Sequence, residues 1–98
     1  MVDIRLTVLD PAGLHQRPAA QVVRTAARFQ SQITLHVGDR SADVKSLIAL
    51  LGMTIRPLAE ITLTADGPDA ADALAALLEE LGQSVELSPG SSERPPLN

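Results

Sequence analysis

Apolar and polar residues alternate in four stretches of the chain, with the period of two that a half-buried β-strand produces. The clearest stretch is residues 2–8, and similar runs cover residues 33–37 and 61–65. A shorter and weaker run covers residues 41–44. Pro11 and Gly13 end the first stretch, and Gly38-Asp39 follows the second as a hairpin turn would. The pattern therefore predicts four strands.

Three further stretches have the spacing of amphipathic helices. Residues 16–29 form the first, and because proline fits a first helical turn, Pro18 places its start at about residue 15 or 16. Residues 46–51 form a brief second helix, which Ser46 should cap and Gly52 should end. The third follows residues 66–69, which should supply its N-cap, and it should end at Gly82. Its apolar stripe consists of Leu74, Leu77, Leu78 and Leu81.

The elements follow in the order strand, helix, strand, strand, helix, strand, helix. Strands with one polar face and helices with one apolar stripe are typical of a two-layer α+β sandwich. The length of 98 residues fits one compact domain, which we place at residues 1–88. Residues 89–98 have the Pro-, Ser- and Gly-rich composition of a linker, and we expect a flexible tail there.

Composition narrows the classes of function. The chain has no cysteine, which excludes disulfides and thiolate metal sites and favours a reducing cytoplasm. No stretch resembles a membrane span or a signal peptide, so we expect a soluble cytoplasmic protein without direct membrane insertion. The net charge of -4 disfavours nucleic acid as a partner.

The charge is unevenly distributed along the chain. Residues 1–58 carry seven basic and four acidic side chains, whereas residues 59–98 carry one basic and eight acidic side chains. The two parts should therefore present different electrostatic faces, which matters for the recognition of charged partners.

The most reactive arrangement in the sequence is a histidine at a predicted helix start. A neutral imidazole nitrogen of His15 is nucleophilic near physiological pH, and the unpaired N–H groups of Gln16 and Arg17 would lie at the positive end of the helix. These N–H groups and the Arg17 guanidinium could hold a phosphoryl group on His15, and Gly13 would allow a sharp turn before it. A histidine at a helix start is also an ordinary polar residue, so these residues alone leave both interpretations open.

Three motifs carry a resemblance to a known family. They are Gly13-Leu14-His15-Gln16-Arg17-Pro18-Ala19, Lys45-Ser46-Leu47 and Ala65-Asp66-Gly67, and they occur in register between residue 2 and about residue 86. Together they resemble HPr, the phosphocarrier of the bacterial sugar phosphotransferase system. The resemblance implies the family's open-faced sandwich, in which three helices cover one face of a four-stranded antiparallel sheet in the order βαββαβα.

The resemblance also implies a function. Phosphorylated enzyme I, charged from phosphoenolpyruvate, would phosphorylate His15 on Nδ1 with the help of Arg17, and His15 would donate the group to the EIIA domain of a sugar permease. Ser46 matches the serine that HPr kinase/phosphorylase modifies in some members. Such a protein would be a monomeric carrier rather than an enzyme, with no cofactor and no metal.

The chain departs from the family pattern in three places. Gln16 replaces a more usual Ala, Ser or Thr, Pro57-Leu58 replaces a Gly-containing turn, and the tail beyond residue 88 is longer than typical. None of these departures changes His15 or Arg17.

The second predicted helix should also provide a docking surface. A helix of fewer than two turns cannot bury all its apolar residues, so Leu50 should lie in the core. Leu47, Ile48 and Leu51 would then form a partly exposed patch. We predict that this patch binds partners together with two residues of the first helix, Ala20 and Arg24. Each apolar residue could equally belong to the core, and a surface arginine is commonly only solubilising.

The second histidine and the paired carboxylates suggest no further site. His36 lies on the polar face of a predicted strand, so we interpret it as a surface residue. The pairs Asp39 with Asp43 and Asp66 with Asp69 lack the loop length and the number of ligands that a calcium site requires.

Other functions remain open on the sequence alone. The same chemistry could serve a nitrogen-related or a dihydroxyacetone kinase phosphorelay, because these relays differ in the partner that binds. A regulatory binding module acting through Ser46 would be expected to lack His15, which is present. A purely structural domain would leave the motif around His15 unexplained, and the chain lacks the second group that a self-sufficient enzyme would need.

Overall fold

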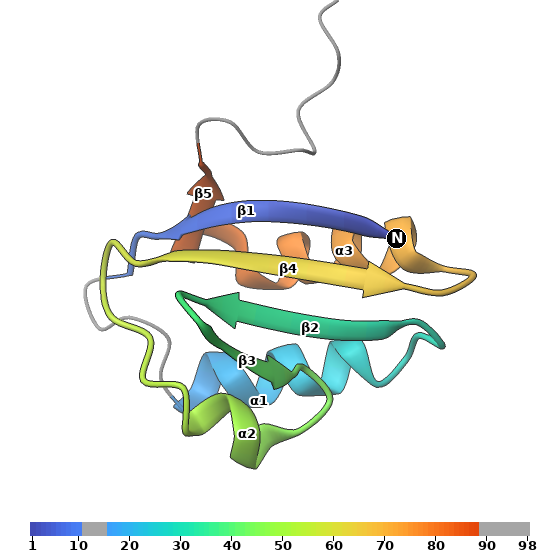
Figure 1. The fold of residues 1–98 in the computed structure, drawn as a ribbon, viewed down its shortest axis with the longest axis horizontal. Helices are drawn as coiled ribbons and strands as arrows, with labels where there is room; N and C mark the ends of the chain where they lie inside the picture. Colours follow the sequence, from blue (N-terminus) through green and yellow to red (C-terminus); the bar gives the residue numbers. More distant parts are fainter. Residues whose placement is uncertain (11–15, 89–98) are drawn as a thin grey trace, which may run out of the picture.

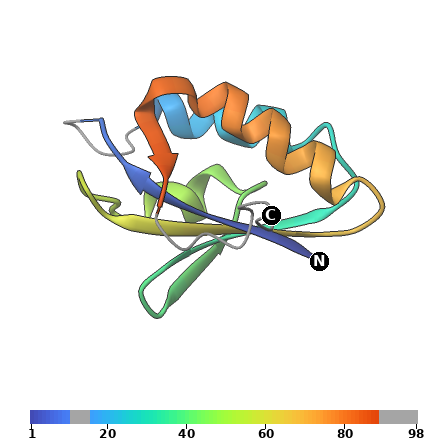
Figure 2. The ribbon, with the colours of Figure 1, turned by 90° about the horizontal axis from the view of Figure 1, so that it is seen from above.

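The computed structural model describes residues 1–10 and 16–88 of the chain. Five antiparallel strands form one sheet in the order β3-β2-β4-β1-β5 (Figure 1). The three α-helices of the described residues lie on one face of this sheet (Figure 2), which confirms the predicted two-layer α+β sandwich. The elements are β1 (Val2–Val8), α1 (Gln16–Ala26), β2 (Gln32–Val37), β3 (Arg40–Asp43), α2 (Leu47–Leu51), β4 (Glu60–Asp66), α3 (Ala70–Leu81), the 3₁₀ turn η1 (Gly82–Ser84) and β5 (Val85–Leu87).

The fifth strand corrects the predicted count of four. β5 pairs with the outer edge of β1, with Val85 opposite Val8 and Leu87 opposite Leu6. Three residues are too few to display an alternating pattern, and their pairing partner lies far away in the sequence, so the pattern could not reveal this strand. Residues 89–98, for which we expect a flexible tail, lie outside the described residues.

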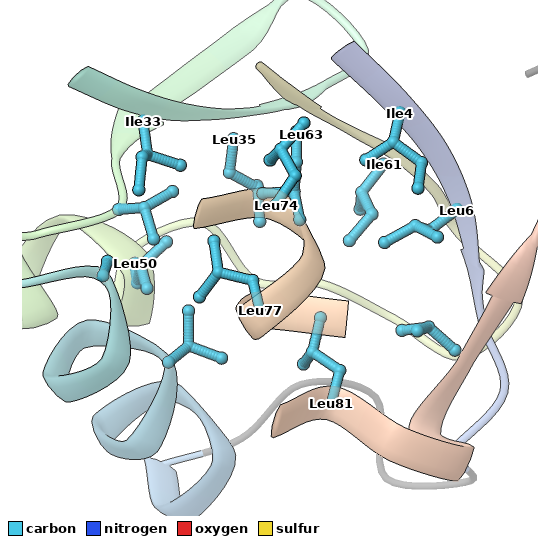
Figure 3. Packing of buried hydrophobic residues seen from close by; sticks show 14 of the residues in the cluster. Ile4, Leu6, Ile33, Leu35, Leu50, Ile61, Leu63, Leu74, Leu77 and Leu81 are labelled. Carbon is cyan, nitrogen blue, oxygen red and sulfur yellow. The ribbon is translucent and has the colours of Figure 1, made fainter. Parts of the chain in front are cut away.

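Strand alternation builds the core. The apolar positions of β1, β2 and β4 face the helices, and they meet the stripe of α3 and one residue of α2 (Figure 3). Each fully buried leucine or isoleucine side chain contributes about 1.5–3 kcal/mol to the stability of such a core. The residues labelled in this core are Ile4, Leu6, Ile33, Leu35, Leu50, Ile61, Leu63, Leu74, Leu77 and Leu81.

The helix α1 begins at the predicted residue and ends three residues before its predicted end at residue 29. Beyond Ala26 the backbone tightens, because the Arg28 N–H donates to the Thr25 carbonyl and the Phe29 N–H donates to the Ala26 carbonyl, both at 3.1 Å. This tighter turn redirects the chain toward Ser31, which is fully buried, and so into β2.

The short helix α2 has the predicted ends. The Ser46 Oγ accepts a hydrogen bond from the Ala49 N–H at 3.2 Å, and Gly52 is the C-cap. The loop that follows contains the departure at Pro57-Leu58. Leu58 has a φ of 67°, a left-handed conformation that glycine adopts without strain, and its side chain is 73% exposed. This loop is hydrogen-bonded to the end of β1, because the Leu58 N–H donates to the Val8 carbonyl at 2.7 Å.

The turn at residues 66–69 supplies the N-cap of α3, as predicted, but the cap makes long-range contacts. Asp69 occupies the N-cap position, but its side chain makes no capping hydrogen bond. Its carboxylate instead accepts hydrogen bonds from the N–H groups of Gln30 and Ser31 and from the Ser31 hydroxyl. Asp69 therefore joins the loop before α3 to the loop after α1, a long-range contact that local capping rules cannot anticipate.

Candidate functional site

The candidate site begins at the N-terminus of α1. His15 lies outside the described residues, and α1 starts at the residue that follows it, Gln16. At Gln16, Arg17 and Pro18 only the backbone is described, so the predicted side-chain roles of Gln16 and Arg17 remain predictions. The first N–H groups of a helix have no intrahelical acceptor and lie at the positive end of its dipole. The backbone at Gln16 and Arg17 is therefore suited to an anion.

The rest of α1 separates a buried face from a basic surface. Ala19, Val22 and Ala26 are buried against the core. Ala20 is half-buried and Arg24, one turn later on the same stripe, is exposed. No acidic residue occurs between residue 11 and residue 38. The helix that starts beside His15 thus combines a positive dipole end with basic side chains.

The predicted apolar patch is present on α2. Leu50 is buried, whereas the side chains of Ile48 and Leu51 are 86% and 42% exposed. Leu47 is half-buried. We name Leu47, Ile48 and Leu51 the α2 patch. Isolated exposed apolar residues are common, but two of them beside the half-buried Leu47 on one five-residue helix form a surface that a partner could cover.

Side chains from neighbouring elements hold α2 in place. Arg40 Nη2 donates a hydrogen bond to the Gly52 carbonyl oxygen at 2.7 Å, at the C-terminal end of α2. At the other end, Lys45 Nζ donates to the Phe29 carbonyl oxygen at 2.7 Å, just after α1. These contacts matter because a five-residue helix has little stability of its own. Neither contact was predicted, since both depend on loops that are brought together by the fold.

The structure places the α2 patch beside the helix that starts next to His15. α2 packs against α1 and β3, and Figure 1 shows the two helices together beside β3. Of the predicted partner-binding residues, Ala20 and Arg24 therefore belong to one helix and the α2 patch to its neighbour. The arrangement is that of a single surface, although its role in binding stays a prediction.

The charge asymmetry of the sequence separates the two long helices. α1 carries the exposed residue Arg24 and is followed by the exposed Arg28, whereas α3 carries acidic residues and no basic one. The two helices pack side by side, and the Thr25 hydroxyl donates to Glu80 Oε1 across their contact at 3.0 Å. The basic side of the helical layer is therefore the side of α1.

His36, the second histidine, lies on the opposite face of the sheet. Its Nε2 is 3.3 Å from the Thr64 hydroxyl on the neighbouring strand β4, and its side chain is half-buried. Within residues 1–10 and 16–88, no three His, Asp or Glu side chains come together as metal ligands. In the same part of the chain, no helix is long and apolar enough to cross a bilayer.

A family comparison decides how the site is to be understood. Residues 2–83 match the family model described as the PTS HPr component phosphorylation site. The chain belongs to the HPr family. HPr is the phosphocarrier of the phosphotransferase system, so the resemblance seen in three sequence motifs is confirmed.

Individual HPr proteins show the same similarity. The chain is 38% identical over 81 residues to the phosphocarrier protein HPr of Lysinibacillus sphaericus. The alignment covers 80% of this chain and 92% of that protein. The solved structure of a histidine-containing phosphocarrier protein from Mycoplasma is 33% identical, with a TM-score of 0.79 over 81% of this chain and 90% of that one. HPr from Bacillus anthracis str. Ames is 34% identical, with a TM-score of 0.75 over 81% of this chain and 94% of that chain.

Proposed function

We propose that His15 carries the phosphoryl group, receiving it from phosphorylated enzyme I and passing it to the EIIA domain of a sugar permease. The observation that supports this most strongly is the family match over residues 2–83, because it includes His15 directly before the first residue of α1. Membership of the HPr family supports a role in the phosphotransferase system. The proposal adds enzyme I as the donor, EIIA as the acceptor and His15 as the residue that carries the phosphoryl group.

The chemistry at His15 is a pair of nucleophilic displacements. The lone pair on Nδ1 of neutral His15 attacks the phosphorus atom, and a new N–P bond forms while the bond from phosphorus to enzyme I breaks. The electron pair of the broken bond stays with enzyme I, and the proton on Nε2 of His15 is retained. In the second step an EIIA nucleophile attacks the phosphorus, and the N–P electron pair returns to Nδ1.

The start of α1 is suited to stabilise the charge in both displacements. Phosphoryl transfer depends on positioning and on electrostatic stabilisation of the phosphoryl oxygens. The backbone N–H groups of Gln16 and Arg17 and the positive dipole end of α1 favour an anion beside His15. The Arg17 guanidinium would bind two phosphoryl oxygens as a fork.

The α2 patch and Arg24 of α1 would recognise the partners. A partner that covers Ile48 and Leu51 removes exposed apolar area from water, and an acidic rim on that partner would pair with Arg24. The protein would act as a monomer that alternates between enzyme I and EIIA, using overlapping parts of this surface.

Ser46 would regulate this binding where a kinase such as HPr kinase/phosphorylase is present. It is half-buried and caps α2 directly before the α2 patch. A phosphate on Ser46 would be tolerated at the helix N-terminus, but it would place negative charge beside Leu47 and Ile48. Partner binding, rather than folding, would then be weakened.

A reconstituted relay tests the donor and the acceptor. Purified chain, enzyme I, EIIA and labelled phosphoenolpyruvate are combined, and each component is omitted in turn. We expect label on EIIA only when both enzyme I and the chain are present. Label on EIIA at the same rate without the chain would contradict the proposal, and label that stops on the chain would contradict EIIA as the acceptor.

A further inference from the structure

The end of β1 and the two residues that follow it are held from both sides by backbone hydrogen bonds. On one side the Val8 N–H donates to the Ala59 carbonyl at 2.9 Å. On the other side the Ser84 carbonyl accepts from the Leu9 N–H at 2.6 Å and from the Asp10 N–H at 3.3 Å. The fold therefore fixes the chain up to Asp10, five residues before His15.

The second of these anchors belongs to a longer segment, residues 84–88, which we name the C-terminal clamp. Within it β5 pairs with β1, and the Ser88 N–H donates to the Arg5 carbonyl at 3.0 Å. The hydroxyls of Ser88 and Thr7 share a hydrogen bond at 2.7 Å. Val85 and Ser88 are only 7% and 3% exposed, so these two residues anchor the clamp in the fold, while Glu86 and Leu87 between them are exposed.

The clamp lies beyond the part of the chain that matches the family model. That match ends at residue 83, and the clamp begins at the next residue. Its contacts nevertheless converge on the end of β1, the strand that leads to His15 (Figure 1).

We propose that the C-terminal clamp is a positioning element for phosphoryl transfer. By holding Leu9 and Asp10 through the Ser84 carbonyl, it sets the point from which the chain continues to His15. This inference rests on the proposed function of His15. Transfer between two proteins requires a close approach in line, and a displacement of about 1 Å in such a geometry costs up to about 100-fold in rate.

The test uses the full chain with one clamp residue changed. Val85→Asp puts a charge where a buried apolar side chain packs, which should release β5 from β1. Val85→Ile keeps the apolar anchor, and Ala71→Asp adds the same charge at an exposed position of α3. Transfer from enzyme I is measured as kcat/KM for the carrier, together with amide exchange at Leu9 and Asp10 and the ring signals of His15.

We expect Val85→Asp to accelerate amide exchange at Leu9 and Asp10, to shift the His15 ring signals and to lower kcat/KM about 10- to 100-fold. Val85→Ile and Ala71→Asp should match the unmodified chain in all three measurements. If Val85→Asp does not fold, Thr7→Val and Thr7→Ser serve instead. Loss of the hydroxyl in Thr7→Val should then slow transfer several-fold, while Thr7→Ser keeps the hydroxyl and should restore it.

Two results would overturn the clamp as a positioning element. One is faster exchange at Leu9 and Asp10 with unchanged transfer, and the other is slower transfer with unchanged exchange at both amides. If the unmodified chain takes no phosphoryl group from enzyme I, the proposed function fails and this inference fails with it. If the unmodified chain does take the phosphoryl group and every variant takes it at the same rate, the clamp inference fails while the proposed function stands.

Discussion

Gly67 packs so closely against Ser31 that a Cβ atom on Gly67 would lie 2.6 Å from both the Cα and the Oγ of Ser31. Real Cβ atoms do not approach backbone atoms to that distance, so this turn accepts only glycine without a shift of the neighbouring loop. The φ of Gly67 is 154°, which also disfavours any side chain. Close packing and backbone conformation thus require the same residue.

We therefore expect Gly67→Ala to destabilise the fold by about 2–4 kcal/mol. Gly38→Ala is a matched control, because Gly38 also has a positive φ but no atom within 4 Å of an added Cβ. It should cost only the conformational penalty, about 1–2 kcal/mol. Urea unfolding of both variants measures the difference. Equal losses would contradict the steric role of Ser31.

The carboxylate of Asp69 makes stability depend on pH. The Ser31 hydroxyl, followed by the Gln30 N–H, lowers the pKa of Asp69 from its ordinary value of 3.8. Because this pKa is lower in the folded state than in the unfolded state, the carboxylate stabilises the fold fully at pH values above its unfolded pKa. This contribution is lost as the pH falls through the folded pKa. The ionised carboxylate is therefore the stabilising form.

Asp69→Asn should be less stable than the unmodified chain near neutral pH, and the gap should narrow as the pH falls below about 5 and through the lowered folded pKa of Asp69. The asparagine cannot ionise, so its contribution stays constant over this range. Unfolding by urea at a series of pH values measures the gap. A gap that stays constant or widens toward low pH would contradict the role of the Asp69 carboxylate.

Ile48, the most exposed apolar residue of α2, should act in binding and not in folding. Ile48→Ser removes a side chain that is 86% exposed, so the free energy of unfolding should change by less than about 0.5 kcal/mol. Binding to enzyme I should weaken about tenfold, because a covered apolar anchor is lost. Leu58→Ser, at a side chain 73% exposed outside the α2 patch, is the control. Unchanged affinity in Ile48→Ser would exclude this surface.

A negative charge at Ser46 should separate folding from binding. Aspartate is as good an N-cap as serine, so Ser46→Asp should keep the thermal stability of the chain. Transfer from enzyme I should slow several-fold, since the charge lies beside the α2 patch. Ser41→Asp adds the same charge at an exposed position of β3 and should leave transfer unchanged. Normal transfer in Ser46→Asp would argue against a regulatory role.

The sequence was most informative where a feature depends on neighbouring residues. The alternation in β1, the start of α1 near Pro18 and the cap of α2 by Ser46 are all local, and the structure confirms each. Contacts across the fold were missed. The partners of Asp69 lie 38 and 39 positions away, and β5 pairs with a strand at the other end of the chain.

In the candidate site, too, the local features could be predicted from the sequence and the contacts across the fold could not. The motif around His15 and the exposed patch of α2 could be proposed from residue types and helix length, because both are properties of short segments. The bond from Arg40 to the Gly52 carbonyl and the clamp on Leu9 could not, because the groups meet only after the sheet has formed. Leu58 in a left-handed conformation was also unforeseen, since only the fold imposes it.

The most direct test of the account is the mass of the chain after incubation with phosphoenolpyruvate and enzyme I. The unmodified chain and His36→Ala should each gain one phosphoryl group, which acid removes and base does not, as expected for a phosphohistidine. His15→Ala should gain none, because its only remaining histidine, His36, lies on the opposite face of the sheet. A phosphoryl group on His15→Ala would contradict the assignment of His15 as the carrier. So would a His36→Ala variant that gains no phosphoryl group while His15→Ala gains one.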